Sequence, residues 1–302
     1  MAFSFWKALG HGLTRVRERP LDAARIWAFD ALLLAVVPGF LIIVSGAWSG
    51  PGEPVAFATL SPLQTAALIA SLWSLPVFWL ASEGAWARFL ATGEPATAIP
   101  YRLGRDELRI FGVIALWAVV GFLLLLCLIL PIGLVGVLAE QGGPGGRAGA
   151  ALLVGAAIGI SMFIMPRIHT SMMLAVRRKA FSPLGHFSAS DPFWFRLGLA
   201  FGVAYILSLV SGYILPGLAA LAAGYTADVA GMISRGSLIP WSNWAASKPS
   251  IGFAEVLVLL VAWIGGSFGL LLTRGVFAHA ALHALEQHEL DARGSYPAGA
   301  ST

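Results

Sequence analysis

The sequence has few charged residues and a single cysteine. Charged residues make up 11% of the 302 residues, whereas hydrophobic residues make up 58%, and the mean hydropathy is +0.81. So little polar surface excludes an ordinary water-soluble globule and predicts a membrane protein. Because Cys127 is the single cysteine, an intrachain disulfide is excluded and a metal site built from thiolates is disfavoured.

Sequence signatures of catalysis are also missing. The segment GGPGGRAG at 142–149 lacks the Gly-Lys-Ser/Thr ending of a phosphate-binding loop. His279 and His283 have the spacing of two metal ligands on a helix, but no Glu follows His279 and no third ligand is indicated, which favours an interfacial pair. The Gly-x-Ser-x-Gly match at 265–269 lies inside the predicted span 252–273, not at the strand-to-helix turn of a nucleophile elbow. We therefore expect no enzymatic activity, no catalytic residues, no cofactor and no metal.

What the sequence does have is long runs without charge. Residues 110–139 contain no charged side chain, and a helix of about 20 apolar residues already crosses the roughly 30 Å of hydrocarbon in a bilayer. Five other segments meet the same criterion. We predict an all-α, polytopic transmembrane bundle with six helices, at about residues 25–48, 60–82, 110–139, 149–176, 197–225 and 252–273.

The segments that flank these spans are expected to lie at the membrane surface. In residues 1–20 the apolar side chains share one helical face, which predicts an amphipathic interfacial helix, with a frayed basic tail as the alternative. Short cytoplasmic elbow helices are expected before the later spans. The last helix is expected to continue past Arg274 towards Leu290, so that residues 1–290 form a single domain and 291–302 a disordered tail.

The distribution of Lys and Arg predicts the orientation. With both termini in the cytoplasm, the inner segments hold sixteen basic residues and the outer loops 49–60, 140–148 and 228–255 hold three. This is the positive-inside bias of a multi-pass plasma-membrane protein. It also accounts for the basic pI of about 9.6 without a nucleic-acid partner.

A weak internal repeat divides the chain into three hairpins of about 85 residues. Each odd span follows a basic elbow, and each even span continues into a polar extension: EGAWARFLA, HTSMMLAVRRKAF and RGVFAHAALHAL. Duplication is one explanation. The alternative is that any membrane hairpin needs a basic elbow and a loop.

Ionisable residues at the predicted inner boundary of the hydrocarbon are the candidate ligand-binding site. An unpaired charge at the centre of a span costs at least about 2.5 kcal/mol, so such residues should pair or reach towards water. One hypothesis is an inner-leaflet polar cluster that binds a lipid headgroup, an anion or a proton, and the other is a set of ordinary flanking residues. The residues concerned are Asp30, Glu83, Arg167, His169 and Arg274.

A second candidate is a basic surface for lipid headgroups or a partner. Within RLGRDELR, helical i,i+4 spacing pairs Arg102 with Asp106 and sets Arg105 beside Arg109, and Arg177 and Arg178 form a second cluster. The alternative is a surface helix whose charges neutralise one another and set topology.

Glycines spaced four residues apart suit close helix packing, within one chain or between copies. They are Gly155 and Gly159, Gly198 and Gly202, and Gly265 and Gly269. The expected partners are therefore membrane lipids and, through these faces, other membrane proteins or a second copy.

The opening FSFWKALGHG…RERP, the elbow PYRLGRDELR and the six-helix plan carry a family resemblance. They resemble an uncharacterised group of bacterial six-helix inner-membrane proteins, which is similar to the membrane domain attached to some glycerophosphodiester phosphodiesterases. The resemblance implies a bacterial inner membrane and a link to envelope lipids. It implies no catalytic residues, because the catalytic module of those phosphodiesterases is a separate soluble domain.

We expect from these features a non-enzymatic protein that binds or moves lipid-like or small amphiphilic molecules. A structural or accessory subunit of a membrane complex, acting through its glycine faces and elbows, is the alternative.

Overall fold

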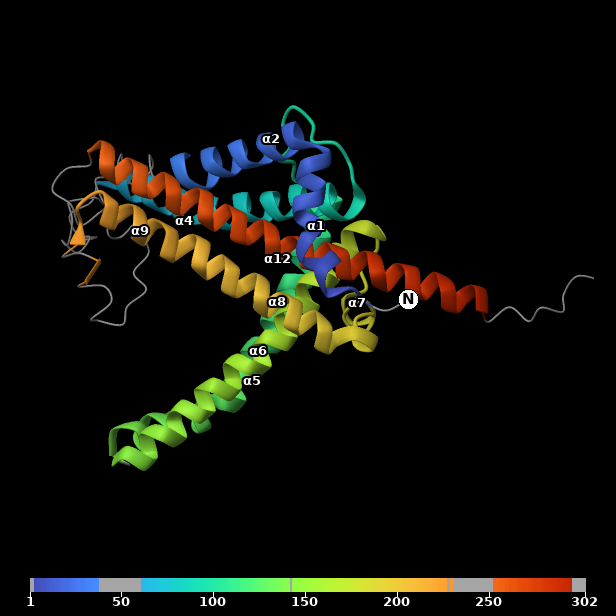
Figure 1. Cartoon of the computed structure of the whole chain (residues 1–302). Coiled ribbons are helices and arrows are strands. Elements are labelled where there is room, and N and C mark those ends of the chain that lie inside the picture. Colours follow the sequence, from blue (N-terminus) through green and yellow to red (C-terminus); the bar gives the residue numbers. More distant parts are fainter. Residues whose placement is uncertain (1–2, 38–60, 142, 227–228, 231–251, 295–302) are drawn as a thin grey trace, which may run out of the picture.

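The computed structural model describes residues 3–37, 61–141, 143–226, 229–230 and 252–294, and these residues contain helices and irregular segments but no strand (Figure 1). Four helical stretches among them are long and apolar enough to cross a membrane: Pro62–Thr92, Gly159–Arg177, Pro183–Ala222 and Phe253–Glu289. This is the make-up of an all-α, multi-pass membrane protein.

The N-terminal part contains α1 (Phe5–Glu18), α2 (Pro20–Asp30) and the π-helical turn η1 (Ala31–Val36), followed by α4 (Pro62–Ala87) and its π-helical continuation η3 (Arg88–Thr92). Ser61 starts α4 with a capping box, in which its hydroxyl accepts from the backbone N–H of Gln64 and the Gln64 side chain accepts from the Ser61 N–H. The predicted first span begins within α2, and its remainder, 38–48, lies outside the described residues.

The next two helices, α5 (Arg105–Gln141) and α6 (Gly143–Arg177), form a hairpin. In Figure 1 this hairpin extends away from the other helices as a separate arm. The predicted outer loop 140–148 is wrong, because α5 continues to Gln141 and α6 begins at Gly143. Gly143 has the left-handed φ of 58°, and Pro144 follows it in the first turn of the helix, where its missing N–H costs nothing. The charged elbow also differs from the prediction: its last residues, 105–109, are the first turn of α5.

The C-terminal part begins with the short helices α7 (Pro183–Ser188) and η4 (Asp191–Phe193). A nearly straight run follows, consisting of α8 (Trp194–Leu209), η5 (Val210–Ile214) and α9 (Leu215–Ala222). It lies beside α12 (Phe253–Gly294), which joins the predicted sixth span and its helical tail in one helix (Figure 1). Because α12 continues to Gly294, the disordered tail expected from residue 291 is helical in its first residues.

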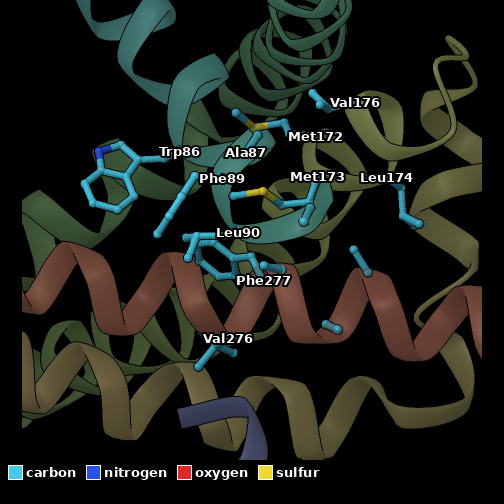
Figure 2. Packing of buried hydrophobic residues seen from close by; sticks show 14 of the residues in the cluster. Trp86, Ala87, Phe89, Leu90, Met172, Met173, Leu174, Val176, Val276 and Phe277 are labelled. Atoms are coloured by element: carbon cyan, nitrogen blue, oxygen red, sulfur yellow. The ribbon is translucent and has the colours of Figure 1, made fainter. Parts of the chain in front are cut away.

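Most of the buried core lies where three helices end or continue beyond their apolar spans. We call this region the junction, and it consists of residues 81–91, 170–176 and 271–281, all of which are buried except for the half-buried His279. Figure 2 shows Trp86, Leu90, Met173 and Phe277 meeting there. The three segments of the junction overlap the polar extensions EGAWARFLA, HTSMMLAVRRKAF and RGVFAHAALHAL of the predicted repeat.

Helix α1 crosses α12 at the junction. A Cβ atom on Gly275 would lie 2.6 Å from the backbone nitrogen of Gly12, and one on Gly12 would lie 2.7 Å from the carbonyl oxygen of Leu271. The face of α1 that contains Gly12 is therefore covered by α12, while Trp6 and Leu13 on its other faces are exposed. The predicted amphipathic helix exists, but much of its apolar face contacts protein.

Candidate functional site

The carboxylate of Asp30, at the end of α2, is held by three donors from two other segments. Oδ1 accepts from the Ser82 hydroxyl at 2.6 Å and from the Tyr101 hydroxyl, and Oδ2 accepts from the Trp86 indole N–H at 2.9 Å. Burial, and then the Asp30 charge, raise the pKa of Tyr101 far above its usual value, so its hydroxyl remains a donor. Three hydrogen bonds therefore fix this carboxylate against α4 and the segment that contains Tyr101.

Glu83 and Arg274 form a buried ion pair beside this carboxylate. Oε1 of Glu83 lies 2.5 Å from Nη2 and 3.2 Å from Nε of Arg274, and both side chains are more than nine-tenths buried. The guanidinium carbon of Arg274 is 5.4 Å from the centroid of the Trp86 ring, which also contacts Asp30. The structure thus brings Asp30, Glu83 and Arg274 into one region, as the cluster hypothesis requires, and pairs Glu83 with Arg274 while Asp30 is held by Ser82, Trp86 and Tyr101.

Arg167 does not join this cluster. Its guanidinium pairs with Asp191, donates to the Ser190 hydroxyl at 3.1 Å and to the Phe187 carbonyl at 3.2 Å, and lies 3.9 Å from the centroid of the Phe187 ring. The hypothesis placed Arg167 with the carboxylates of α2 and α4. Instead, the loop after α6 returns beside the helix and supplies a nearer carboxylate.

His169 also serves a local role. Its Nδ1 lies 3.0 Å from the Met165 carbonyl oxygen of its own helix, and its ring stacks on Phe277 with centroids 4.7 Å apart. It therefore joins α6 to α12 through ring packing, apart from the Asp30 carboxylate.

A second buried ion pair, Arg88 with Glu107, was missed by the sequence analysis. Arg88 also donates to the Pro100 carbonyl at 3.2 Å, and Oε2 of Glu107 accepts from the Gly104 N–H at 2.9 Å. Glu107 is 2% exposed, although the elbow was expected to be a charged surface helix. Glu107, Ile110 and Val113 recur every three residues on one helical face and are all buried, so the signal was present in the spacing.

The basic residues predicted for the surface form different ion pairs from the expected pair of Arg102 with Asp106. Arg102 pairs with Glu94 at 3.3 Å, and Arg109 pairs with Asp106 at 2.6 Å. Arg105 is exposed. At the end of α6, the exposed Arg177 donates to the Thr92 carbonyl at 3.3 Å, and Arg178 is half-buried.

The histidines of α12 pack against rings of the N-terminal segment and of η4. The His279 ring lies 5.8 Å from His11 and 5.5 Å from Phe3, and His283 lies 5.1 Å from Phe193. Over the residues that the structure describes, no group of three or more His, Cys, Asp or Glu side chains could hold a metal ion. The arrangement is one of ring packing.

Three cavities formed by described residues lie outside the Asp30, Glu83 and Arg274 cluster. One, of about 210 Å³, lies beside the elbow and is lined by Arg88, Glu94 and Arg102, whose charges are already paired. The other two, of about 340 and 370 Å³, adjoin each other between the loop that contains α7 and η4 and the C-terminal part of α12.

Comparison with protein-family models, with curated proteins and with solved structures finds no match to this chain.

Proposed function

We propose that this protein works in the bacterial inner membrane without enzymatic activity and binds or moves lipid-like or small amphiphilic molecules. In this proposal the chain crosses the membrane six times with both termini in the cytoplasm, as the charge distribution of its loops favours. The resemblance to the membrane domain of some glycerophosphodiester phosphodiesterases supports a link to envelope lipids.

One observation carries the proposal: the segments next to the junction expose both apolar and basic side chains. The apolar ones include Trp6 on α1, Leu21 on α2 and Leu184 on α7, and Arg105 and Lys179 are exposed in neighbouring segments. An interfacial environment satisfies both kinds of side chain, because acyl chains cover the apolar ones and anionic headgroups attract the cations.

The buried charges do not supply the binding site in this proposal. Asp30, Glu83 and Arg274 are satisfied by one another and by neighbouring donors. A ligand entering there would have to break the ion pair and leave charges buried without partners, which costs several kcal/mol. We therefore assign this cluster to holding α2, α4 and α12 together, and assign ligand binding to the surface of the junction.

The test is lipid mass spectrometry of the purified protein, followed by titration with nanodisc lipids. We expect co-purifying amphiphiles, and tighter binding to phosphatidylglycerol than to phosphatidylcholine. Glu83→Gln should lower the thermal stability and leave the lipids bound by the folded fraction unchanged. If only detergent is found, and neither lipid binds, the proposal fails.

The accessory-subunit alternative is supported by one glycine face. A Cβ atom on Gly155 or Gly159 of α6 would meet nothing within 4 Å, whereas one on Gly269 would collide with Ser208 of α8. Gly265 and Gly269 of α12 are thus used within the chain, whereas Gly155 and Gly159 of α6 remain open to another helix. Gly159→Leu should abolish crosslinking to a partner or second copy if this face is an interface, and Gly121→Leu, at another open position, should not.

A further inference from the structure

The two adjoining cavities near the C-terminal part of α12 form one groove, because Pro192 and Gln287 line both. We call it the α7–α12 groove. Its polar end, of about 370 Å³, is also lined by Arg178, Ser182 and His288. Its other end, of about 340 Å³, is aromatic, with Phe3, Phe193, Trp194 and Phe195 beside Arg196.

The charge that the described residues place in this groove is positive. Neither lining contains a carboxylate, and among the residues that the structure describes neither Arg178 nor Arg196 has a carboxylate within salt-bridge distance. Nearby cations behave differently, since Arg167 pairs with Asp191 at the edge of the same loop. An anion entering the groove therefore meets guanidinium groups that no described carboxylate neutralises.

The sizes of the two ends limit the ligand. Small-molecule sites usually measure about 300–1,000 Å³, so either end holds a headgroup and neither holds a whole phospholipid. The acyl chains must then leave the groove over an apolar surface. Trp194 and Phe195, 45% and 53% exposed at the start of α8, provide one, and exposed aromatic side chains at the end of a span are typical of the membrane interface.

We propose that the α7–α12 groove binds the phosphate group of an anionic phospholipid. Arg178 and the Ser182 hydroxyl donate to the phosphate oxygens at the polar end, and the acyl chains pass Trp194 and Phe195 into the bilayer. This inference rests on the proposed function and names its ligand class and its site.

The test uses the full-length protein in nanodiscs and compares three proteins: the wild type, Arg178→Gln in the groove and Arg105→Gln outside it. Each substitution removes one arginine charge from a residue without a carboxylate partner among the described residues, so the pair separates the groove from general surface attraction. We expect Arg178→Gln to weaken phosphatidylglycerol binding about tenfold, through the loss of charge-assisted hydrogen bonds, and Arg105→Gln to change it less than twofold. Ser182→Asp, which puts a negative charge at an exposed position in the groove, should weaken it in the same way.

Glycerol phosphate serves as the soluble competitor and distinguishes the source of the phosphate. If the groove binds a lipid, millimolar glycerol phosphate should leave phosphatidylglycerol bound. Competition at micromolar concentration would overturn the lipid assignment in favour of a free phosphate compound. Equal effects of Arg178→Gln and Arg105→Gln would overturn the groove while leaving lipid binding intact, and the absence of any lipid binding would overturn the proposed function as well.

Discussion

The junction and the apolar spans differ in how they are packed. In the junction almost every side chain is buried against protein, and Leu90 is 0% exposed. In the first apolar turns of α4 most side chains face outward, and Leu72 is 60% exposed. Hydrocarbon covers an outward Leu as well as protein does, so a span needs little protein packing, whereas the segments beyond the hydrocarbon bury apolar surface away from water.

The two regions therefore have different roles. The spans provide length and apolarity, and the junction provides the contacts that fix one helix against another. Three of the chain's ion-pair systems lie at or beside the junction, built on Arg88, Arg167 and Arg274. Each joins segments that are separate in sequence, so we expect that substitutions there destabilise the fold far more than those in the spans.

The largest effect is expected for Arg274→Ala. Removing the guanidinium leaves Glu83 buried without its partner, which should cost about 3–5 kcal/mol of unfolding free energy. Thermal unfolding in detergent measures it. The double replacement of Glu83 and Arg274 by Met should recover most of the loss, and a single variant as stable as the wild type would contradict the role of this pair.

A smaller effect is expected for Gly275→Val, at the crossing of α1 and α12. Its Cβ would approach the Gly12 backbone to 2.6 Å, so the two helices must separate, at a cost of about 1–3 kcal/mol. Limited proteolysis should then cut within residues 5–18 faster than in the wild type. Gly266→Val serves as the control, because a Cβ there meets nothing within 4 Å, and equal proteolysis of both variants would refute the close crossing.

The smallest effect is expected from the protonation of His11. Burial lowers the pKa of His11 below its usual 6.5, against the opposing effect of its 3.1 Å hydrogen bond with the Leu90 carbonyl. The unfolded chain therefore binds more protons between the lowered pKa and about 6.5, and the stability contributed by neutral His11 is lost as the pH falls through this window. Unfolding of the wild type and His11→Gln at pH 7.5 and 5.5 should show a smaller drop in the variant, and an equal drop would exclude His11 as a source of the pH dependence.

The sequence predicted the apolar helices because their signal is local. Long uncharged runs and a length matched to the bilayer identify α4 and α12 without any knowledge of their neighbours. The same reasoning failed at residues 140–148, where a glycine- and proline-rich stretch was taken as a loop. Pro144 there occupies the first turn of α6, a position that proline favours.

The partners of the charged residues could not be predicted, because pairing depends on the fold. The sequence indicates that Glu83 and Arg274 each need a partner, but 191 residues separate them and several cations were possible. Arg167 was assigned to the same cluster by its depth in the helix alone. Its partner Asp191 lies in the loop between α6 and α8. The positions of the apolar spans in the sequence do not predict the path of this loop.

The most direct test of the difference between the regions is a matched pair of leucine substitutions in one continuous helical segment. Leu90→Ala in the junction should lower the free energy of unfolding by about 2–5 kcal/mol, because it leaves a cavity among buried side chains. Leu72→Ala, on the outward face of α4, should lower it by less than about 1 kcal/mol, since the Leu72 side chain is mostly exposed. Thermal unfolding of both variants in lipid nanodiscs gives the comparison, and equal losses would contradict the account that the junction holds this fold together.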